Sequence, residues 1–443
     1  METPICDFVA RYAAGDTLRL HMPGHKGKVL LGPEPMDLTE IPGADSLYDP
    51  QGIIHQSEEN AGRLFGCHTF YSTEGSSHCI RAMLTLALQQ AVRQGKAPVI
   101  AAARNAHKAF IHAVALLDLQ VQWLDPGKGE SYLSCCPSPR QVDDFLRAAP
   151  EKPFAVYLTS PDYLGCLGDI EGIAQVCHQH GCLLLVDNAH GAYLRFLEQS
   201  LHPMDLGADL CCDSAHKTLP VLTGGAYLHI SYHAPQQVAS QAKNALALHG
   251  STSPSYLILQ SLDRANAWLD QGYVKTYAAR AEVLRHRLEQ KGLAFYGQEP
   301  LKLTLKANAM GYTGLELGQR LRQQGIECEF ADPAYVVLMP SATMTEEELD
   351  RLEQILADIE LRTPLQQEQP AFHPCCQVMS VRQAMLSPAK TVRVEDSLGR
   401  ILAAPSVSCP PAVPIVVCGE QIDQTAVELL RLYGVERCTV VDQ

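Results

Sequence analysis

The stretch CCDSAHKTLP, residues 211–220, decides how this chain is interpreted. An apolar, strand-like run at residues 208–212 leads into His216 and Lys217, and a second apolar run follows at residues 225–230. A lysine between two such runs is unusual, because burying an ammonium group is costly unless something neutralises it. Forming a Schiff base with an aldehyde is one of the few chemical reasons to place it there. The alternative is a lysine on a surface loop, since lysine side chains are seldom buried. The neighbouring motifs favour the Schiff base.

The segment CLLLVDNAHGAY, residues 182–193, ends an apolar run at Asp187 and continues to His190. Such a run, bounded by polar residues, is typical of a buried parallel strand. Open α/β sheets bind their ligands at the carboxyl ends of these strands. A carboxylate there can pair with a protonated pyridine nitrogen and keep the ring of pyridoxal phosphate electron-poor. The alternative is an aspartate that caps the next helix, but a lysine thirty residues on, at the next strand end, favours the cofactor.

Small polar residues open a helix-like segment in STEGSSHCIRAM, residues 72–83. Gly75, Ser76 and Ser77 precede apolar residues at helical spacing. Because a helix N-terminus carries free N–H groups and a favourable dipole, it binds anions readily. The serine pair alone is more typical of an ordinary helix cap.

These motifs are collinear with others, and the chain resembles the Orn/Lys/Arg decarboxylase family of fold-type-I pyridoxal-phosphate enzymes, in its shorter form. The resemblance covers residues from about 20 to 265. The matching segments are LHMPGHKG (20–27), DLTEIPGADSLYDPQGII (37–54), RNAHKAF (104–110), TSPDYLG (159–165), SAHKTLPVLTGGA (214–226) and GSTSPSYLILQSLD (250–263).

The resemblance implies a role for each residue that matches a family motif. Lys217 takes the Schiff-base position, Asp187 the pyridine-nitrogen position, and His107 the position of an imidazole stacked on the ring. The simpler interpretation of His107 is a polar residue at a helix start. We also expect His190 among the cofactor contacts. For the phosphate group, the resemblance implies contacts from Ser76, Ser77, Ser214 and His216. The family turn reads NGSTSG where this chain has TEGSSH, which leaves the individual phosphate contacts open.

Ser251 and Thr252 belong to an element that, in the family, reaches the cofactor phosphate of the neighbouring subunit. The resemblance therefore implies a homodimer or a higher homo-oligomer with shared active sites. The alternative is an ordinary polar loop before a helix at residues 256–270.

Composition narrows the function classes. A chain of 443 residues should form two or three domains. Its net charge of −14 argues against nucleic-acid binding and is compatible with a cationic substrate. The 16 cysteines lack zinc-type spacing and are interpreted as small buried apolar residues, so no metal is expected. There is no apolar run of membrane-spanning length and no signal-peptide layout, which predicts a cytoplasmic protein without membrane contact.

Alternating strand-like and helix-like runs predict an α/β fold with a mainly parallel sheet flanked by helices. The strands are expected at residues 99–103, 121–124, 154–159, 183–187, 208–212 and 225–230. A long helix is expected at 253–291, and from about residue 293 a small α+β domain with strands at 301–307, 326–332 and 335–341. The predicted domains are residues 1–290, binding the cofactor, 291–362, the small α+β domain, and 375–443, a C-terminal domain after a linker at 363–374.

The function predicted from this resemblance is decarboxylation of arginine, lysine or ornithine with pyridoxal phosphate. Lys217, His216, Asp187 and His107 are the catalytic candidates, and either His216 or Lys217 reprotonates Cα. A different pyridoxal-phosphate reaction, such as aminotransfer or elimination, is possible on the same fold. A catalytically silent homologue is a third hypothesis. Three acidic residues lie in motif segments where a substrate's basic group could bind, namely Asp45, Asp162 and Glu420, the last in SCPPAVPIVVCGEQI (408–422), which resembles a further element of the family.

Overall fold

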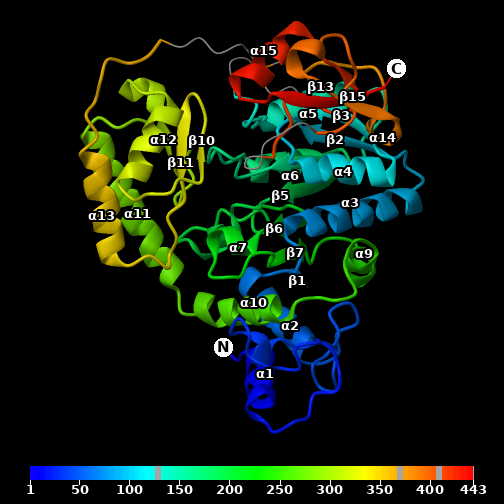
Figure 1. Cartoon of the computed structure of the whole chain (residues 1–443). Helices are drawn as coiled ribbons and strands as arrows, with labels where there is room; N and C mark the ends of the chain where they lie inside the picture. Colours follow the sequence, from blue (N-terminus) through cyan, green and yellow to red (C-terminus); the bar gives the residue numbers. More distant parts are fainter. Residues whose placement is uncertain (125–130, 367–371, 373, 406–411, 443) are drawn as a thin grey trace. The chain divides into compact units, whose positions relative to one another are not determined.

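The computed structural model describes residues 1–124, 131–366, 372, 374–405 and 412–442 (Figure 1). The chain divides into two compact units. The first unit combines Met1–Ala97 with Cys177–Thr276, and the second combines Pro98–Val176 with Tyr277–Gln443.

Four strands of the first unit lie in the order β1-β7-β6-β5. They are β1 (His68–Ser72), β5 (Leu183–Asp187), β6 (Leu210–Asp213) and β7 (Ala226–Ile230). Strands β5 and β6 are parallel, with Asp187 opposite Cys212, whereas β7 runs antiparallel to both β6 and β1. Every residue of β6 and β7 is buried, as their continuous apolar sequences predict.

The helices of the first unit lie around these strands or, in the case of α1, against the helices α2 and α10 (Figure 1). They are α1 (Pro4–Ala14), α2 (Ile53–Phe65), α3 (Ser76–Arg93), α7 (Ala215–Thr218), α8 (Gln236–Ser240), α9 (Ala242–His249) and α10 (Tyr256–Leu269). Helix α3 packs against β5, β6 and β7, and α9 packs against α3. Ten of the 18 residues of α3 are buried, so a broad apolar surface holds α3 in place.

The parallel strands of the second unit lie in the order β4-β2-β3. They are β2 (Val99–Ala103), β3 (Gln120–Leu124) and β4 (Ala155–Thr159). Helices α4 (Lys108–Leu117), α5 (Pro139–Ala148) and α6 (Ile170–Gln179) connect or follow them, which is the βα repeat expected from the sequence. The predicted α/β fold class with a mainly parallel sheet is thus confirmed.

The remaining chain of the second unit forms three antiparallel sheets. Strands β8 (Phe295–Tyr296), β9 (Leu303–Lys306), β10 (Phe330–Ala331) and β11 (Tyr335–Leu338) accompany α12 (Gly314–Gln323) and α13 (Glu346–Ala357). The C-terminal segment contains β12 (Cys376–Gln377), α14 (Val381–Leu386), β13 (Ala389–Arg393), β14 (Glu420–Gln421), α15 (Gln424–Leu432) and β15 (Arg437–Val441). Helix α14 packs against α4, and β13 pairs with β15.

The structure corrects two predicted elements. The single long helix at 253–291 is two helices, α10 and α11 (Tyr273–Gln290), because Gly272 between them has φ +76°. A left-handed residue ends a helix, and glycine adopts that conformation without a steric penalty. The strand predicted at 326–332 is reduced to the two residues of β10. Helix α13 begins with a capping box formed by Thr345 and Glu348.

Within the described ranges, none of the helices combines the length and the apolar character needed to cross a membrane. Residues 367–371 and 373 of the predicted linker and residues 406–411 of the C-terminal segment lie outside the described residues. The domain boundaries expected from the sequence stay a prediction.

Candidate active site

Lys217 lies on α7, a single helical turn between the end of β6 and the start of β7. Its side chain is exposed, so the expectation of a buried lysine is wrong. The reason is local, because the chain leaves the buried strand at Asp213 and turns as a short helix that carries the lysine out of the core. The amine Nζ lies 3.1 Å from Nε2 of His190.

Asp187 is the last residue of β5 and is only 2% exposed. Its Oδ1 accepts the main-chain N–H of Ala189 at 3.2 Å and the thiol of Cys212 at 3.7 Å. His190 belongs to the turn that follows the same strand. The carboxyl ends of β5 and β6 therefore bring together Asp187, His190 and Lys217, as the sequence predicts for a ligand site at this edge.

The N-terminus of α3 forms a cradle for an anion beside this group. Gly75 has φ +73°, and no described side chain caps the helix. A Cβ at Gly75 would meet no described atom within 4 Å, so the space over the helix start is open. Ser214 donates its hydroxyl to Oγ of Ser76 at 2.7 Å, which places the residue before α7 at the same helix end as Ser77. Uncapped N–H groups and hydroxyls at the start of a long helix fit the phosphate of pyridoxal phosphate.

Two residues that depart from the family turn, Glu74 and His78, are structural anchors. His78 is fully buried, with Nδ1 at 2.8 Å from Oγ of Ser72 and Nε2 at 2.7 Å from the carbonyl oxygen of Leu246. Burial lowers the pKa of His78, which favours the neutral imidazole. Glu74 accepts the main-chain N–H of Ser251 at 2.6 Å. Both side chains therefore tie the turn to the segment around residue 250.

His216 is half-buried, and its Nδ1 lies 3.0 Å from the carbonyl oxygen of Gly225. A carbonyl only accepts, so Nδ1 carries the hydrogen of this contact. Burial lowers the pKa of His216, which favours the neutral ring with a proton-accepting Nε2. His216 is thereby suited to accept a proton at Nε2 and to return one.

A fully buried charge cluster behind the site was not predicted from the sequence. One oxygen of Asp213 accepts Nε2 of His202 at 3.0 Å and Nε2 of His229 at 3.1 Å, and the other accepts the amide of Asn188 at 2.7 Å. Burial is the largest influence and raises the pKa of Asp213, but the two imidazoles outweigh it and lower that pKa. The cluster holds Asn188, the residue next to Asp187. A histidine within the apolar strand β7 was the only signal in the sequence.

His107 belongs to the second unit, where it is the N-cap of α4 and its Nδ1 accepts the N–H of Ala109 at 3.1 Å. The simpler interpretation from the sequence, a polar residue at a helix start, is therefore correct, and ring stacking stays a prediction. In the first unit, Ser251 and Thr252 are exposed on the loop after α9, and their role toward a neighbouring subunit also stays a prediction.

The three acidic candidates for a substrate's basic group all have other partners. Asp45 accepts the main-chain N–H groups of several residues that begin or precede α2. Asp162 accepts the hydroxyl of Ser134 at 2.5 Å. Glu420 pairs with Arg104 at 2.9 Å, and both side chains are 1% exposed. These carboxylates stabilise loops or the core, so the residue that selects the substrate side chain stays open.

Comparison with known proteins identifies relatives over almost the whole chain. The chain is 28% identical to an arginine decarboxylase of Halalkalibacterium halodurans, covering 97% of this chain and 93% of that protein. It is 27% identical to an arginine decarboxylase of Bacillus subtilis, covering 96% and 92%. The crystal structure of a lysine decarboxylase from Francisella novicida has the same fold, with a TM-score of 0.81, 16% identity and coverage of 99% and 81%.

The model of the family described as Orn/Lys/Arg decarboxylase, major domain, matches residues 3–291, which include every candidate cofactor residue. Solved pyridoxal-phosphate enzymes of other kinds, such as a serine palmitoyltransferase from Sphingomonas wittichii, share only the fold, with a TM-score of 0.53 over 69% of this chain and 75% of that one. With the lysine, the carboxylate and the anion cradle gathered in one unit, the chain belongs to the Orn/Lys/Arg decarboxylase family of pyridoxal-phosphate enzymes.

Proposed function

We propose that the protein decarboxylates a basic amino acid, arginine, lysine or ornithine, to the corresponding amine and carbon dioxide. The observation that carries the proposal is the grouping of Lys217, Asp187 and the α3 N-terminus within one compact unit. Arginine is the first substrate to test, because relatives named arginine decarboxylase align with nearly the whole chain.

Each group has a task in this reaction. Lys217 would hold the cofactor through its aldehyde group, and the N–H groups of Ser76 and Ser77 would hold its phosphate with help from Ser214. Asp187 keeps the pyridine nitrogen protonated, because a buried carboxylate beside it favours the cation. When bound, pyridoxal phosphate supplies the electron sink that lets the bond between Cα and the carboxylate break.

Two side chains are candidates for returning a proton to Cα. Lys217 carries an amine that would lie close enough to the cofactor's aldehyde carbon to donate a proton. His216 offers Nε2 on a half-buried ring whose other nitrogen faces Gly225. Replacing His216 by glutamine separates the two, because loss of the proton donor should lower kcat more than it raises KM.

The test begins with the lysine. Borohydride should fix the cofactor on Lys217, seen as a mass increase on its peptide, and K217A should lack both the label and the visible absorbance band. Lys275→Ala is the matched control, since that lysine is also exposed in the first unit. Label on another lysine with Lys217 untouched would contradict the proposal. Carbon dioxide release from the three amino acids, with identification of the amine, then selects the substrate, and a keto acid product would indicate aminotransfer instead.

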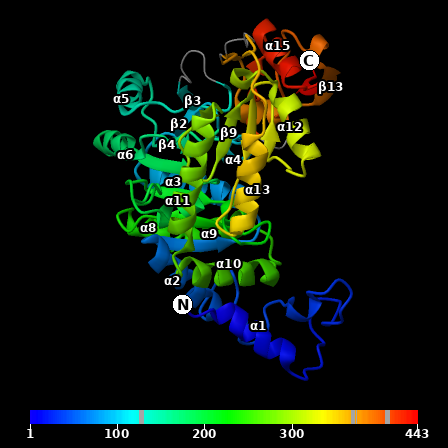
Figure 2. The ribbon, with the colours of Figure 1, turned by 90° about the vertical axis from the view of Figure 1, so that its left-hand side faces the viewer.

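We also propose a homodimer with shared sites, in the cytoplasm as the sequence suggests. The loop 250–253 is open to a neighbouring subunit, and a twofold interface builds two equivalent shared sites. The segment after α1 adds a surface that a second copy would cover, because it forms a loop beyond α1 (Figure 2) with many exposed apolar side chains. These are Leu18, Leu20, Met22, Val29, Leu30 and Leu31.

Subunit mixing tests the shared site. A mixture of K217A with the double variant S251A/T252A should regain partial activity, because each mixed dimer holds one site with both defects and one with neither. Mixing K217A with wild type gives the reference for subunit exchange. A fully active monomer, or no complementation despite proven exchange, would overturn the shared site without touching the proposed reaction.

A further inference from the structure

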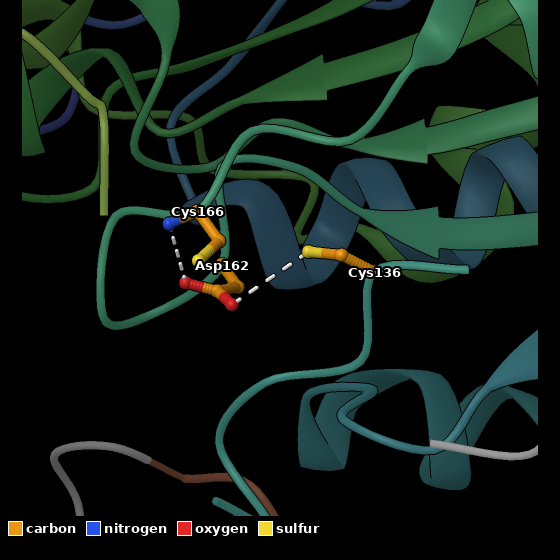
Figure 3. A group of neighbouring side chains, drawn as sticks. All are labelled: Cys136, Asp162 and Cys166. Carbon is orange, nitrogen blue, oxygen red and sulfur yellow. Dashed lines mark hydrogen bonds between the residues drawn. The ribbon is translucent and has the colours of Figure 1, made fainter. Parts of the chain in front are cut away.

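A second group of reactive side chains, in the second unit, contains none of the residues given a role in the proposed reaction. Cys136 belongs to the loop that follows β3, and Asp162 and Cys166 belong to the loop that follows β4. Because β3 and β4 are both parallel to β2, these two loops leave the same edge of their sheet. Figure 3 shows the three side chains pointing toward one another.

The geometry of this group is that of three metal ligands. The two sulfur atoms and a carboxylate oxygen lie within 4.8 Å of one another. The thiol of Cys136 contacts Oδ2 of Asp162 at 3.8 Å. Two ligands of a tetrahedral zinc ion, one sulfur and one oxygen, stand about 3.6 Å apart when the metal bonds have their usual lengths. Only a small movement separates the observed arrangement from a coordinating one.

The carboxylate is held firmly for this task. Its Oδ1 accepts the main-chain N–H groups of Leu164 at 3.0 Å and Cys166 at 2.9 Å. Its Oδ2 accepts the hydroxyl of Ser134 at 2.5 Å. Hydrogen bonds of this kind orient the ligating carboxylates of metal sites.

The charge balance around Asp162 points to a missing cation. Its side chain is 0% exposed, and no lysine or arginine forms an ion pair with it in the part of the chain that the structure describes. The ammonium of Lys302 donates to the main-chain oxygen of Asp162 at 3.3 Å, and its ion pair at 2.7 Å is made with Glu299. A cation bound at Oδ2 would supply the charge that this carboxylate lacks.

We propose that Cys136, Asp162 and Cys166 bind a thiophilic divalent cation, Zn²⁺ being the natural choice. Thiolates select zinc over magnesium or calcium, and three protein ligands leave one position for water. Binding exchanges protons for the metal, since each thiol loses its hydrogen to solvent as its sulfur takes a bond to Zn²⁺. The ion would join the loops after β3 and β4. This site is independent of the proposed reaction and departs from the sequence expectation of no metal.

The experiment uses the full-length, tag-free protein with its cofactor, reduced, freed of metal with a chelator and desalted. Zinc is titrated by calorimetry into the wild type and Cys136→Ser, and bound metal is measured after desalting. We expect one equivalent more in the wild type and an affinity at least about tenfold weaker in the variant. Cys376→Ser is the matched control, since Cys376 is also exposed but lies far along the chain in the C-terminal segment. Because C376S carries the same cofactor, this control also measures any zinc that the cofactor itself binds.

Two further readouts identify the ligands. Zinc should slow alkylation of Cys136 and Cys166 by iodoacetamide, but not that of Cys376, as peptide masses show. Cobalt in place of zinc should give a thiolate charge-transfer band in the difference spectrum that C136S lacks. Equal zinc affinity in wild type and C136S, or unprotected cysteines, would overturn the site. A Cys136–Cys166 disulfide that forms in air while the reduced protein takes up no zinc would overturn it in favour of a redox pair.

Discussion

Two aspartates, one in each unit, follow parallel strands and are fully buried, yet they have different partners. Asp213 ends β6 and lies between the imidazoles of His202 and His229. Asp162 follows β4 and receives hydrogen bonds from a hydroxyl, a thiol and main-chain N–H groups. The first carboxylate is hydrogen-bonded to imidazoles that can carry positive charge, whereas the second is hydrogen-bonded to neutral donors and feels the charge of Lys302 without pairing with it.

This difference shows that burial alone does not decide the charge of a carboxylate. Burial raises the pKa of both groups, but the imidazoles reverse the effect at Asp213 and lower its pKa, whereas the pKa of Asp162 stays raised. Asp213, at the edge that carries the cofactor residues, therefore has ionisable partners within the protein. The edge of the second unit holds a carboxylate that a metal ion would complete.

The largest effect is expected for Asp213→Asn. The change leaves two buried imidazoles without their carboxylate, and breaking a buried ion pair from one side costs about 3–5 kcal/mol of unfolding free energy. Denaturant unfolding of the cofactor-free protein measures the loss. His178→Ala is the control, because its partner Asp209 belongs to a half-exposed pair in the same unit. Equal losses of unfolding free energy in the two variants would show that the buried cluster stabilises the fold no more than the half-exposed pair does.

The pH dependence of that loss has a defined sign. A lowered pKa means that Asp213 adds stability above its ordinary value of 3.8, and that this stability disappears as the pH falls through the folded-state value. The pKa of His229 is raised, since Cys67 and Asp213 outweigh burial, which lowers it. Its contribution is complete below 6.5 and is lost as the pH rises through the folded-state value. The deficit of D213N should thus be greatest between about pH 4 and 6.5.

Asp187→Asn comes next and acts on turnover instead of stability. The variant keeps the shape of the pocket and should retain cofactor, but the pyridine nitrogen loses the carboxylate that keeps it protonated. Loss of a preorganised electrostatic partner lowers kcat by roughly 10²-fold or more. Steady-state decarboxylation with cofactor content measured in the same sample checks this. Near-normal kcat would show that Asp187 has only a structural role.

Apolar strands could be predicted from the sequence almost to the residue. Strands β2 and β5 coincide with the predicted runs at 99–103 and 183–187. Both strands are mostly buried and consist of consecutive, mainly apolar residues, and such a run predicts a buried strand clearly. Strand β1, HTFYS, was not predicted, because it mixes polar and apolar residues and pairs antiparallel with β7. Its partner lies more than 150 residues away in sequence, beyond the reach of any local pattern.

The active site likewise has features that the sequence predicted and features that only the structure shows. The motifs predicted that Asp187, Ser76 and Lys217 belong together, and the structure gathers them in one unit. The contact of Lys217 with His190 and the exposure of the lysine depend on how α7 turns, which the motif does not reveal. The Asp213 cluster needs His202 from a loop and His229 from a neighbouring strand, so only the folded chain displays it.

Asp162→Asn should have a small effect on stability, within about 1 kcal/mol in the absence of metal. The amide oxygen keeps the main-chain hydrogen bonds, and the hydroxyl of Ser134 can turn to accept from the new amide. A raised pKa means that the wild type loses stability as the pH rises from 3.8 through the folded-state value of Asp162. The variant lacks this loss, so its stability relative to the wild type should improve as the pH rises above 3.8, whereas the stability of D213N relative to the wild type should worsen as the pH rises toward 3.8. A pH dependence of the same sign in both variants would contradict the comparison.

The smallest effect is expected for Cys136→Ser in metal-free protein. Cys136 is exposed and its thiol is a weak donor to Asp162, so replacing sulfur by oxygen keeps a donor in place and removes little packing. The free energy of unfolding should change by less than about 0.5 kcal/mol. Adding Zn²⁺ should raise the melting temperature of the wild type but not that of the variant. The reason is that a ligand stabilises a protein when it binds only the folded state. A metal-free variant much less stable than the metal-free wild type would contradict this expectation. It would mean that the thiol of Cys136 stabilises the loop and the Asp162 carboxylate without a metal ion.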